Sequence, residues 1–315
     1  MAHAAGGLLQ AIGNTPLLKL DRLPEPGSAE VYVKLEGCNP SGSMKDRMAA
    51  SMVAGAERRG DLPPGGRVVD YTGGSTGSSL AMVCAAKGYK ARFVSSDAFA
   101  EEKIQTMRAF GATVEIHKSV NRKVTPELIQ AMIARARELA AQPNHFWTDQ
   151  FNNPDNRAGY HPMAREILTA LDGRLDAFVM AVGTGGCFSG NAEVLKERAP
   201  GVRCVALEPA ASPMLSKSGP LGGHRIEGTG PGFVPSICRM DLADAIVAVS
   251  DEDAYATARR LGQEEGILAG ISCGANLWAA LRLARELGPG RRVVTVMVDS
   301  GLKYLQGDLH QARTT

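Results

Sequence analysis

Short apolar segments alternate with helix-like segments along most of the chain, and this alternation limits the possible folds more than any other feature of the sequence. The segments 67–71, 177–182 and 292–298 are rich in apolar residues and read as strands. Unbroken apolar strands that alternate with helices are typical of parallel sheets covered on both faces. We therefore predict an α/β fold in which each sheet is mostly parallel and covered by helices.

Length and charge narrow the class of protein. The chain has 315 residues, of which 44% are hydrophobic, and this is enough to form two lobes with buried cores. Its 35 basic and 33 acidic residues nearly cancel, and neither sign forms a long run, so nucleic acid and anionic membranes are not indicated as partners. A small-molecule partner is expected instead.

The sequence shows no targeting or metal-binding pattern. Its first residues lack the basic, apolar and cleavage-site succession of a signal peptide, and no apolar run reaches the roughly 18 residues of a membrane span. The six cysteines form no C-x-x-C pair, and the six histidines form no H-E-x-x-H motif. We expect a cytoplasmic protein with reduced cysteines, no metal site and no membrane partner.

The stretch 38–47, Cys-Asn-Pro-Ser-Gly-Ser-Met-Lys-Asp-Arg, ends a strand-like run in a flexible loop and places Lys45 at the start of a helix. Burial and the positive potential of a helix N-terminus keep a lysine amine neutral, and a neutral amine attacks carbonyl groups. Lys45 is therefore a candidate anchor for an aldehyde cofactor. The alternative is a solvated first-turn lysine, which is the commoner state of a lysine considered alone.

Three glycine loops follow predicted strands. The loops 72–77 and 183–187 each lie between a strand and a helix, where backbone amides can bind an anion, and Asp299-Ser300-Gly301 follows the last strand. Ligands of parallel α/β folds bind at the carboxyl ends of the strands, so these loops are candidate binding sites. A purely structural origin is the weaker interpretation, because runs of glycine are entropically unfavourable.

Two other functions fit parts of these loops. Residues 183–190 resemble a dinucleotide fingerprint with Glu208 as the ribose-binding acid, but Phe188 stands where the third glycine is needed. Gly73-Gly74-Ser75-Thr76-Gly77 matches the G-x-S-x-G nucleophile elbow of a serine hydrolase. The same pattern recurs at 270–274, and His310 would have to complete the triad from the chain end, so this rival is the weaker one.

Taken together, the segments resemble the cysteine synthase and cystathionine β-synthase family of pyridoxal-phosphate enzymes, which have fold type II and are similar to the tryptophan synthase β subunit. The resemblance covers nearly the whole chain. Its four ordered matches are the Schiff-base segment 39–47, the phosphate cradle 183–187, and the segments 228–235 and 299–305.

The resemblance implies how each match acts. Lys45 would form the internal aldimine and, once released by the amino acid substrate, would remove the α-proton. Loss of the β-substituent would leave an aminoacrylate, to which a thiol or sulfide adds. Ser300 would meet the pyridine nitrogen. The phosphate contacts would come from Gly183, Thr184, Gly185, Gly186 and Cys187.

The loop 72–77 would then bind the substrate. The implied contacts are Thr72, Gly73, Gly74, Ser75 and Thr76, with Gln150 and Gly228, and Ser75 would also touch the cofactor. The usual family loop reads Thr-Ser-Gly-Asn-Thr-Gly, so Gly73 replaces a serine and Ser75 an asparagine. Cys187 stands where threonine usually helps to hold the phosphate. These departures predict an unusual donor or nucleophile.

The expected reaction is therefore pyridoxal-phosphate-dependent β-replacement, most simply synthesis of L-cysteine from O-acetylserine and sulfide. Alternatives are cystathionine formation from serine and homocysteine, β-elimination, a serine hydrolase using Ser75, and a non-catalytic pyridoxal-phosphate-binding protein. The resemblance also implies a homodimer. It further implies a small mobile lobe at 41–150 that closes over the substrate, with 1–40 and 151–315 forming the large cofactor-binding lobe.

Overall fold

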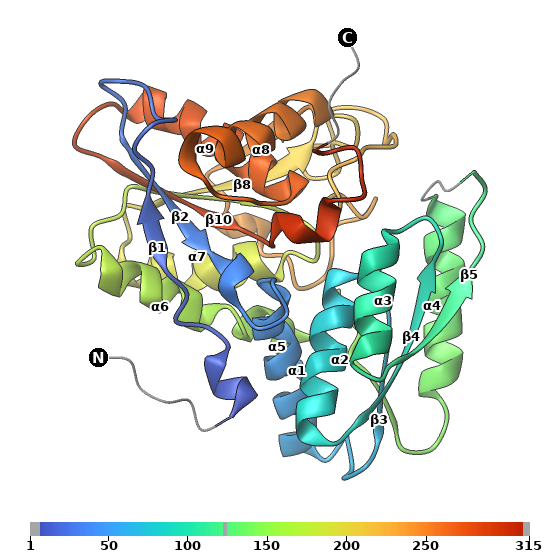
Figure 1. Cartoon of the computed structure of the whole chain (residues 1–315). Coiled ribbons are helices and arrows are strands. Elements are labelled where there is room, and N and C mark those ends of the chain that lie inside the picture. Colours follow the sequence, from blue (N-terminus) through green and yellow to red (C-terminus); the bar gives the residue numbers. More distant parts are fainter. Residues whose placement is uncertain (1–6, 122–124, 311–315) are drawn as a thin grey trace. The chain divides into compact units, whose positions relative to one another are not determined.

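The computed structural model describes residues 7–121 and 125–310 (Figure 1). The chain forms two compact units. The first consists of the described residues up to Gly13 together with Asn39–Gly159, and the second of Asn14–Cys38 and the described residues from Tyr160 onward.

The first unit is built on a parallel sheet with the strand order β5-β4-β3-β6. The strands are β3 (Arg67–Tyr71), β4 (Lys90–Ser96), β5 (Thr113–His117) and β6 (His145–Trp147). Helices α2 (Ser75–Lys87) and α3 (Glu101–Ala109) lie on one face, and α4 (Pro126–Ala140) lies on the other (Figure 1). Helix α1 (Lys45–Arg59) packs on α2 and on the short α5 (Pro154–Ala158).

The bounds of this unit differ from the division expected from the sequence. The 3-10 helix η1 (Leu8–Ala11) packs on α2, and the amide of Gly13 donates a hydrogen bond to Oδ1 of Asn39 at 2.8 Å. These contacts place the described residues before Asn14 with the first unit instead of with the second. Closure of one lobe over the substrate stays a prediction.

The second unit has a six-stranded sheet in the order β1-β2-β10-β7-β8-β9. The strands are β1 (Leu17–Lys19), β2 (Glu30–Leu35), β7 (Ala177–Ala181), β8 (Arg203–Pro209), β9 (Ala245–Val249) and β10 (Arg292–Met297). Strand β1 is antiparallel to β2 and the other pairs are parallel. Every residue of the central strand β7 is buried, as its continuous apolar sequence predicts.

Helices cover both faces of this second sheet (Figure 1). They are α6 (His161–Ala170), α7 (Gly186–Arg198), α8 (Asp251–Glu265) and α9 (Ile271–Leu287), with 3-10 helices η2 (Glu36–Cys38), η3 (Met240–Leu242) and η4 (Gly301–Tyr304). Helix α9 packs on β10 and β7, and α8 packs on α9. The predicted α/β class is confirmed.

One buried amide fixes the strand ends that lead into the predicted cofactor loops. Asn276 on α9 donates a hydrogen bond to the carbonyl of Val296 at 2.9 Å, and its Oδ1 accepts one from the amide of Ala181 at 2.8 Å. Its side chain thereby joins the ends of β10 and β7. The succession Thr125-Pro126-Glu127 is typical of a helix N-terminus, and α4 begins there: the Thr125 hydroxyl accepts a hydrogen bond from the Leu128 amide at 3.3 Å.

Within residues 7–121 and 125–310, no helix combines the length and apolar character needed to cross a membrane. The same part of the chain contains no group of three or more His, Cys, Asp or Glu side chains arranged to hold a metal ion.

Candidate active site

Lys45 is the first residue of α1 and is only 9% exposed. The loop before it is held by the buried carboxylate of Asp46, which accepts a hydrogen bond from the amide of Ser41 at 2.7 Å and another from the Ser41 hydroxyl. The Lys45 amide itself donates to Oγ of Ser43 at 3.2 Å. Lys45 is thus a buried lysine at a fixed helix start, and the solvated alternative does not hold.

The glycine loop that follows β3 is ordered by the side chain of Thr72. Its Oγ1 accepts hydrogen bonds from the amides of Gly74 and Gly77, both at 3.0 Å. Since the oxygen is occupied as an acceptor, the hydroxyl proton of Thr72 is left to be donated elsewhere. The amides of Gly74 and Gly77 donate within this turn, and binding of the substrate by Gly74 stays a prediction.

Thr76 and Gln150, which the resemblance implies as substrate contacts, meet beside this loop. The Thr76 hydroxyl donates to Oε1 of Gln150 at 2.9 Å, and Nε2 of Gln150 donates to the carbonyl of Tyr71 at 3.1 Å. These bonds fix the orientation of the Gln150 amide. Ser75 and Thr76 are the first residues of α2, so their amides have no acceptor within that helix and point to an anion site at its N-terminus.

A buried carboxylate that the sequence reasoning missed supports Gln150. Asp70 on β3 is fully buried and accepts hydrogen bonds from the Thr148 hydroxyl, from Nε1 of Trp147 at 3.2 Å and from the Tyr71 amide at 2.8 Å. Burial raises the pKa of this carboxyl to about 7. Asp70 ties the end of β3 to the end of β6, and this places Gln150 beside the loop. The only signal in the sequence was a charged residue inside an apolar strand.

In the second unit, the loop after β7 forms a cradle of backbone amides at the N-terminus of α7. Gly185 has φ +81°, and the amide of Gly186 donates to the hydroxyl of Thr184 at 3.3 Å. The loop holding Gly228 lies directly against it, because a Cβ on Gly183 would meet the Gly228 carbonyl oxygen at 2.1 Å. The structure therefore brings Gly228 and the predicted phosphate cradle together.

The end of β10 presents Ser300. Its hydroxyl oxygen accepts a hydrogen bond from the Leu302 amide at 3.3 Å at the start of η4. Asp299 beside it is 2% exposed and accepts a hydrogen bond from the Tyr304 hydroxyl at 2.8 Å. Because the oxygen of Ser300 is used as an acceptor, its proton is available to a ligand that itself accepts hydrogen bonds.

The predicted residues fall into two groups, one in each unit. Loop 72–77 and Gln150 follow β3 and β6 of the first sheet, and the cradle 183–187 and Ser300 follow β7 and β10 of the second, so these residues lie beyond the carboxyl ends of parallel strands. Lys45, loop 72–77 and Gln150 belong to the first unit. The cradle 183–187, Gly228 and Ser300 belong to the second.

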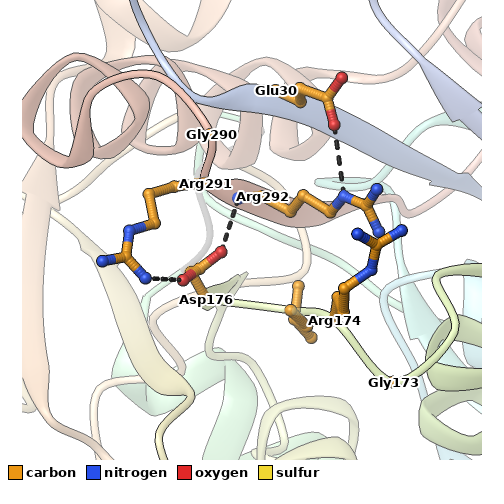
Figure 2. Close-up of a pocket in the computed structure, with 8 residues that line it drawn as sticks. Glu30, Gly173, Arg174, Asp176, Gly290, Arg291 and Arg292 are labelled. Carbon is orange, nitrogen blue, oxygen red and sulfur yellow. Dashed lines mark hydrogen bonds and ion pairs between the residues drawn. The ribbon is translucent and has the colours of Figure 1, made fainter.

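A pocket of about 580 Å³ lies elsewhere in the second unit (Figure 2). It is lined where β2, β7 and β10 begin, by Glu30, residues 173–176 and residues 290–292. None of the predicted site residues lines it. It lies at the opposite ends of these strands from the cradle and Ser300.

Comparison with known proteins decides the family. Residues 8–299 match the family model described as pyridoxal-phosphate dependent enzyme. The chain is 42% identical over 307 residues to the cysteine synthase of Staphylococcus aureus, and the match covers 96% of each chain. The chain belongs to the pyridoxal-phosphate-dependent enzymes.

Solved structures of this family agree with the assignment. An O-ureido-L-serine synthase superposes with a TM-score of 0.91 at 37% identity, covering 98% of this chain and 95% of the other. An O-acetylserine-dependent cystathionine β-synthase from Helicobacter pylori gives a TM-score of 0.91 at 34% identity, covering 98% of this chain and all of the other. The predicted fold type II architecture is confirmed, and pyridoxal phosphate is the cofactor.

The residues present fit that cofactor. The glycine cradle at a helix N-terminus suits a phosphate, and no side chain could replace hydrogen at Gly183 without meeting the Gly228 backbone. The hydroxyl of Ser300 suits an uncharged pyridine nitrogen, which accepts a hydrogen bond. Cys187 is buried in the first turn of α7, and Nδ2 of Asn191 lies 3.6 Å from its sulfur. A thiol there is a weaker hydrogen-bonding partner for a phosphate than a hydroxyl.

Proposed function

We propose that this enzyme replaces the β-substituent of a serine-derived amino acid, most simply forming L-cysteine and acetate from O-acetylserine and sulfide. The observation that carries the proposal is the hydrogen bond from the Leu302 amide to Ser300. It leaves the serine proton for the pyridine nitrogen, and a hydroxyl, unlike a carboxylate, does not hold that nitrogen protonated. This limits the electron-withdrawing power of the ring and favours prompt expulsion of the β-substituent.

The predicted residues of each unit have a role in this reaction. Lys45 would hold the cofactor and carry the α-proton of the donor, returning a proton to the same carbon after the nucleophile has added to the β-carbon. The cradle 183–187 would bind the phosphate, with Cys187 a weak partner. Bound pyridoxal phosphate supplies the electron sink for the pair of electrons released at the α-carbon.

The loop after β3 would bind the α-carboxylate of the donor. The available donors are the Thr72 hydroxyl and the amides of Ser75 and Thr76, with the second amide proton of Gln150. Gly73 would contribute backbone only, and Gly228 would line the second half of the substrate site. Acetate leaves with the electron pair of the C–O bond, and sulfide supplies the pair for the new C–S bond.

Three further features belong to this proposal. The protein acts as a homodimer, works in the cytoplasm, and closes its first unit over the bound substrate. They are supported by the resemblance of the chain to cysteine synthases and by its lack of charge runs that would direct it to nucleic acid or membranes.

A second candidate is cystathionine formation from serine and homocysteine. Ser75 is smaller than the asparagine of the usual loop, and the smaller residue is compatible with a bulkier substrate. Plain β-elimination, which stops before the nucleophile adds, is the other variant of the same chemistry.

The test is a substrate panel with the purified, cofactor-loaded enzyme. O-acetylserine, O-phosphoserine and serine are each supplied with sulfide or homocysteine, and products are identified by mass spectrometry. We expect the highest kcat/KM for L-cysteine formation from O-acetylserine and sulfide. A preference for serine with homocysteine would establish the second candidate. Ester hydrolysis by protein that contains no pyridoxal phosphate would instead support Ser75 as a hydrolase nucleophile.

A further inference from the structure

Three side chains at four-residue spacing cover the glycines of the substrate loop. A Cβ built on Gly77 would lie 2.3 Å from Sδ of Met107, and one built on Gly74 would lie 2.4 Å from Cδ of Lys103. Both residues belong to α3. Phe99 lies two residues before the first residue of α3, and four positions before Lys103. Residues four apart lie on one face of a helix, so one face of α3 packs against the loop.

Phe99 occupies the space where a side chain at position 73 would lie. A Cβ on Gly73 would meet Cε1 of the Phe99 ring at 2.9 Å and Cδ1 at 3.1 Å. Real Cβ atoms do not approach a ring that closely, so a side chain at 73 and the ring in its present position exclude each other. The absence of a serine at 73 is therefore matched by the presence of an aromatic ring.

The Phe99 ring also packs against the core of the first unit. Phe99 packs against a buried core cluster that includes Val69, Tyr71 and Val94, and Phe151 packs against the same cluster. Tyr71 and Phe151 stack with ring centroids 5.9 Å apart and planes 10° from parallel. Phe99 is only half-buried, so the residue keeps some surface that the described protein does not cover.

We propose that Phe99 is a specificity-determining residue that gives the substrate loop an apolar wall and raises activity with thiol nucleophiles that carry an apolar or aromatic substituent, in addition to the activity with sulfide. This inference rests on the proposed function, in which loop 72–77 binds the donor carboxylate. The β-carbon, where the substituents exchange, lies two bonds beyond that carboxylate. An aromatic ring beside the loop therefore contacts the apolar substituent of an incoming thiol.

The test compares sulfide with thiophenol and benzyl mercaptan as nucleophiles, with O-acetylserine as the common donor. Wild type is measured with Phe99→Ala, Gly73→Ser and the double variant. We expect Phe99→Ala to reduce the ratio of kcat/KM for the aromatic thiols to that for sulfide by about tenfold, the usual effect of losing one apolar contact surface. Phe110→Ala, a phenylalanine at the other end of α3, is the matched control and should leave the ratio unchanged.

A second measurement does not depend on turnover. Gly73→Ser forces the Phe99 ring to move, so it should lower the thermal midpoint of wild type by several degrees and have a much smaller effect when Phe99 is already alanine. The four proteins should also keep the same visible absorbance of bound cofactor.

Different results would contradict the role of Phe99, its steric coupling to position 73, and the proposed function. Cysteine formation from sulfide with a thiol ratio that Phe99→Ala does not change would overturn the role of Phe99 while leaving the proposed function intact. Equal effects of Gly73→Ser on the thermal midpoint in both backgrounds would overturn the steric coupling. A wild-type enzyme that adds neither sulfide nor aromatic thiols would refute both the proposed function and this inference.

Discussion

The hydroxyl of Thr76 donates a hydrogen bond to Oε1 of Gln150 at 2.9 Å, although 74 positions separate the two residues in the sequence. The bond joins the first turn of α2 to the segment that follows β6. The Gln150 amide is also held by the Tyr71 carbonyl, so it is oriented before any substrate arrives. Its second N–H proton is the one that we propose Gln150 donates to the carboxylate of the substrate.

Replacing Gln150 by glutamate tests this arrangement. The substitution keeps the shape of the side chain but loses the donated N–H groups and places a negative charge beside the donor carboxylate. We expect the KM for O-acetylserine to rise at least tenfold with a smaller change in kcat, as measured by steady-state kinetics. Gln142→Glu, the same change at an exposed site in the same unit, should leave KM unchanged. An unchanged KM for Gln150→Glu would remove this residue from the substrate site.

Lys45→Ala should abolish turnover and prevent covalent trapping of pyridoxal phosphate by borohydride. The reason is that the substitution removes the amine to which we assign cofactor attachment and proton transfer. Phosphate contacts in the second unit still permit some non-covalent binding of the cofactor. Lys90→Ala, at an exposed position, is the control. Native absorbance and activity in Lys45→Ala would show that another group does this chemistry.

Ser300→Asp should strengthen the electron sink, because a carboxylate stabilises a protonated pyridine nitrogen. The expected results are a change in the visible spectrum of the bound cofactor and a larger share of side reactions such as exchange of the α-proton, followed by NMR in D₂O. Ser300→Thr keeps the hydroxyl and should behave like wild type. If the aspartate and threonine variants match in spectrum and product partition, Ser300 does not face the ring nitrogen.

Ser75→Asn restores the residue that the usual loop carries. An amide offers a carbonyl and two donors where serine offers one hydroxyl, so we expect tighter binding of O-acetylserine, by up to about tenfold in KM, if that is the native donor. A bulkier native substrate should instead be hindered. The measurement is kcat/KM over the full donor and nucleophile panel. No change for any pair would mean that Ser75 lies outside the site.

Asp70 predicts a pH dependence of stability. Burial raises its pKa in the folded protein to about 7, above the ordinary aspartate value of 3.8, so between these pH values the folded state binds more protons than the unfolded state. Stability that Asp70 contributes is therefore fully present at low pH and is lost as pH rises towards 7. A pKa difference of this size corresponds to at most about 4 kcal/mol, with the hydrogen bonds that the carboxylate accepts already included.

Asp70→Asn removes this ionisation while keeping the side-chain shape. Urea unfolding at pH 5 and pH 8 should show wild type losing stability, relative to the variant, between the two pH values. Asp172→Asn, at an exposed position, is the control and should follow wild type. Parallel stability curves for wild type and Asp70→Asn would mean that the carboxyl titrates near its ordinary pKa.

Sequence alone was sufficient where the signal is local. Alternating apolar strands and helices predicted the α/β class, because burial on both faces of a parallel sheet requires continuous apolar strands such as β7. The sequence also predicted that Lys45 starts a helix and that glycine loops precede α2 and α7, since helix N-termini and strand ends have composition signatures of their own. The N-cap of α4 followed from Thr125-Pro126 for the same reason.

Tertiary structure alone decided which distant residues meet. Strand β6 has only three residues, too few to show a periodic pattern, and it exists because its backbone pairs with β3. That pairing buries Asp70 against Thr148 and sets Gln150 beside Thr76. The sequence likewise showed Gly73 as a departure from the usual loop, but only the structure gives its reason. The Phe99 ring fills the space, and packing between residues far apart in sequence is set by the path of the whole chain.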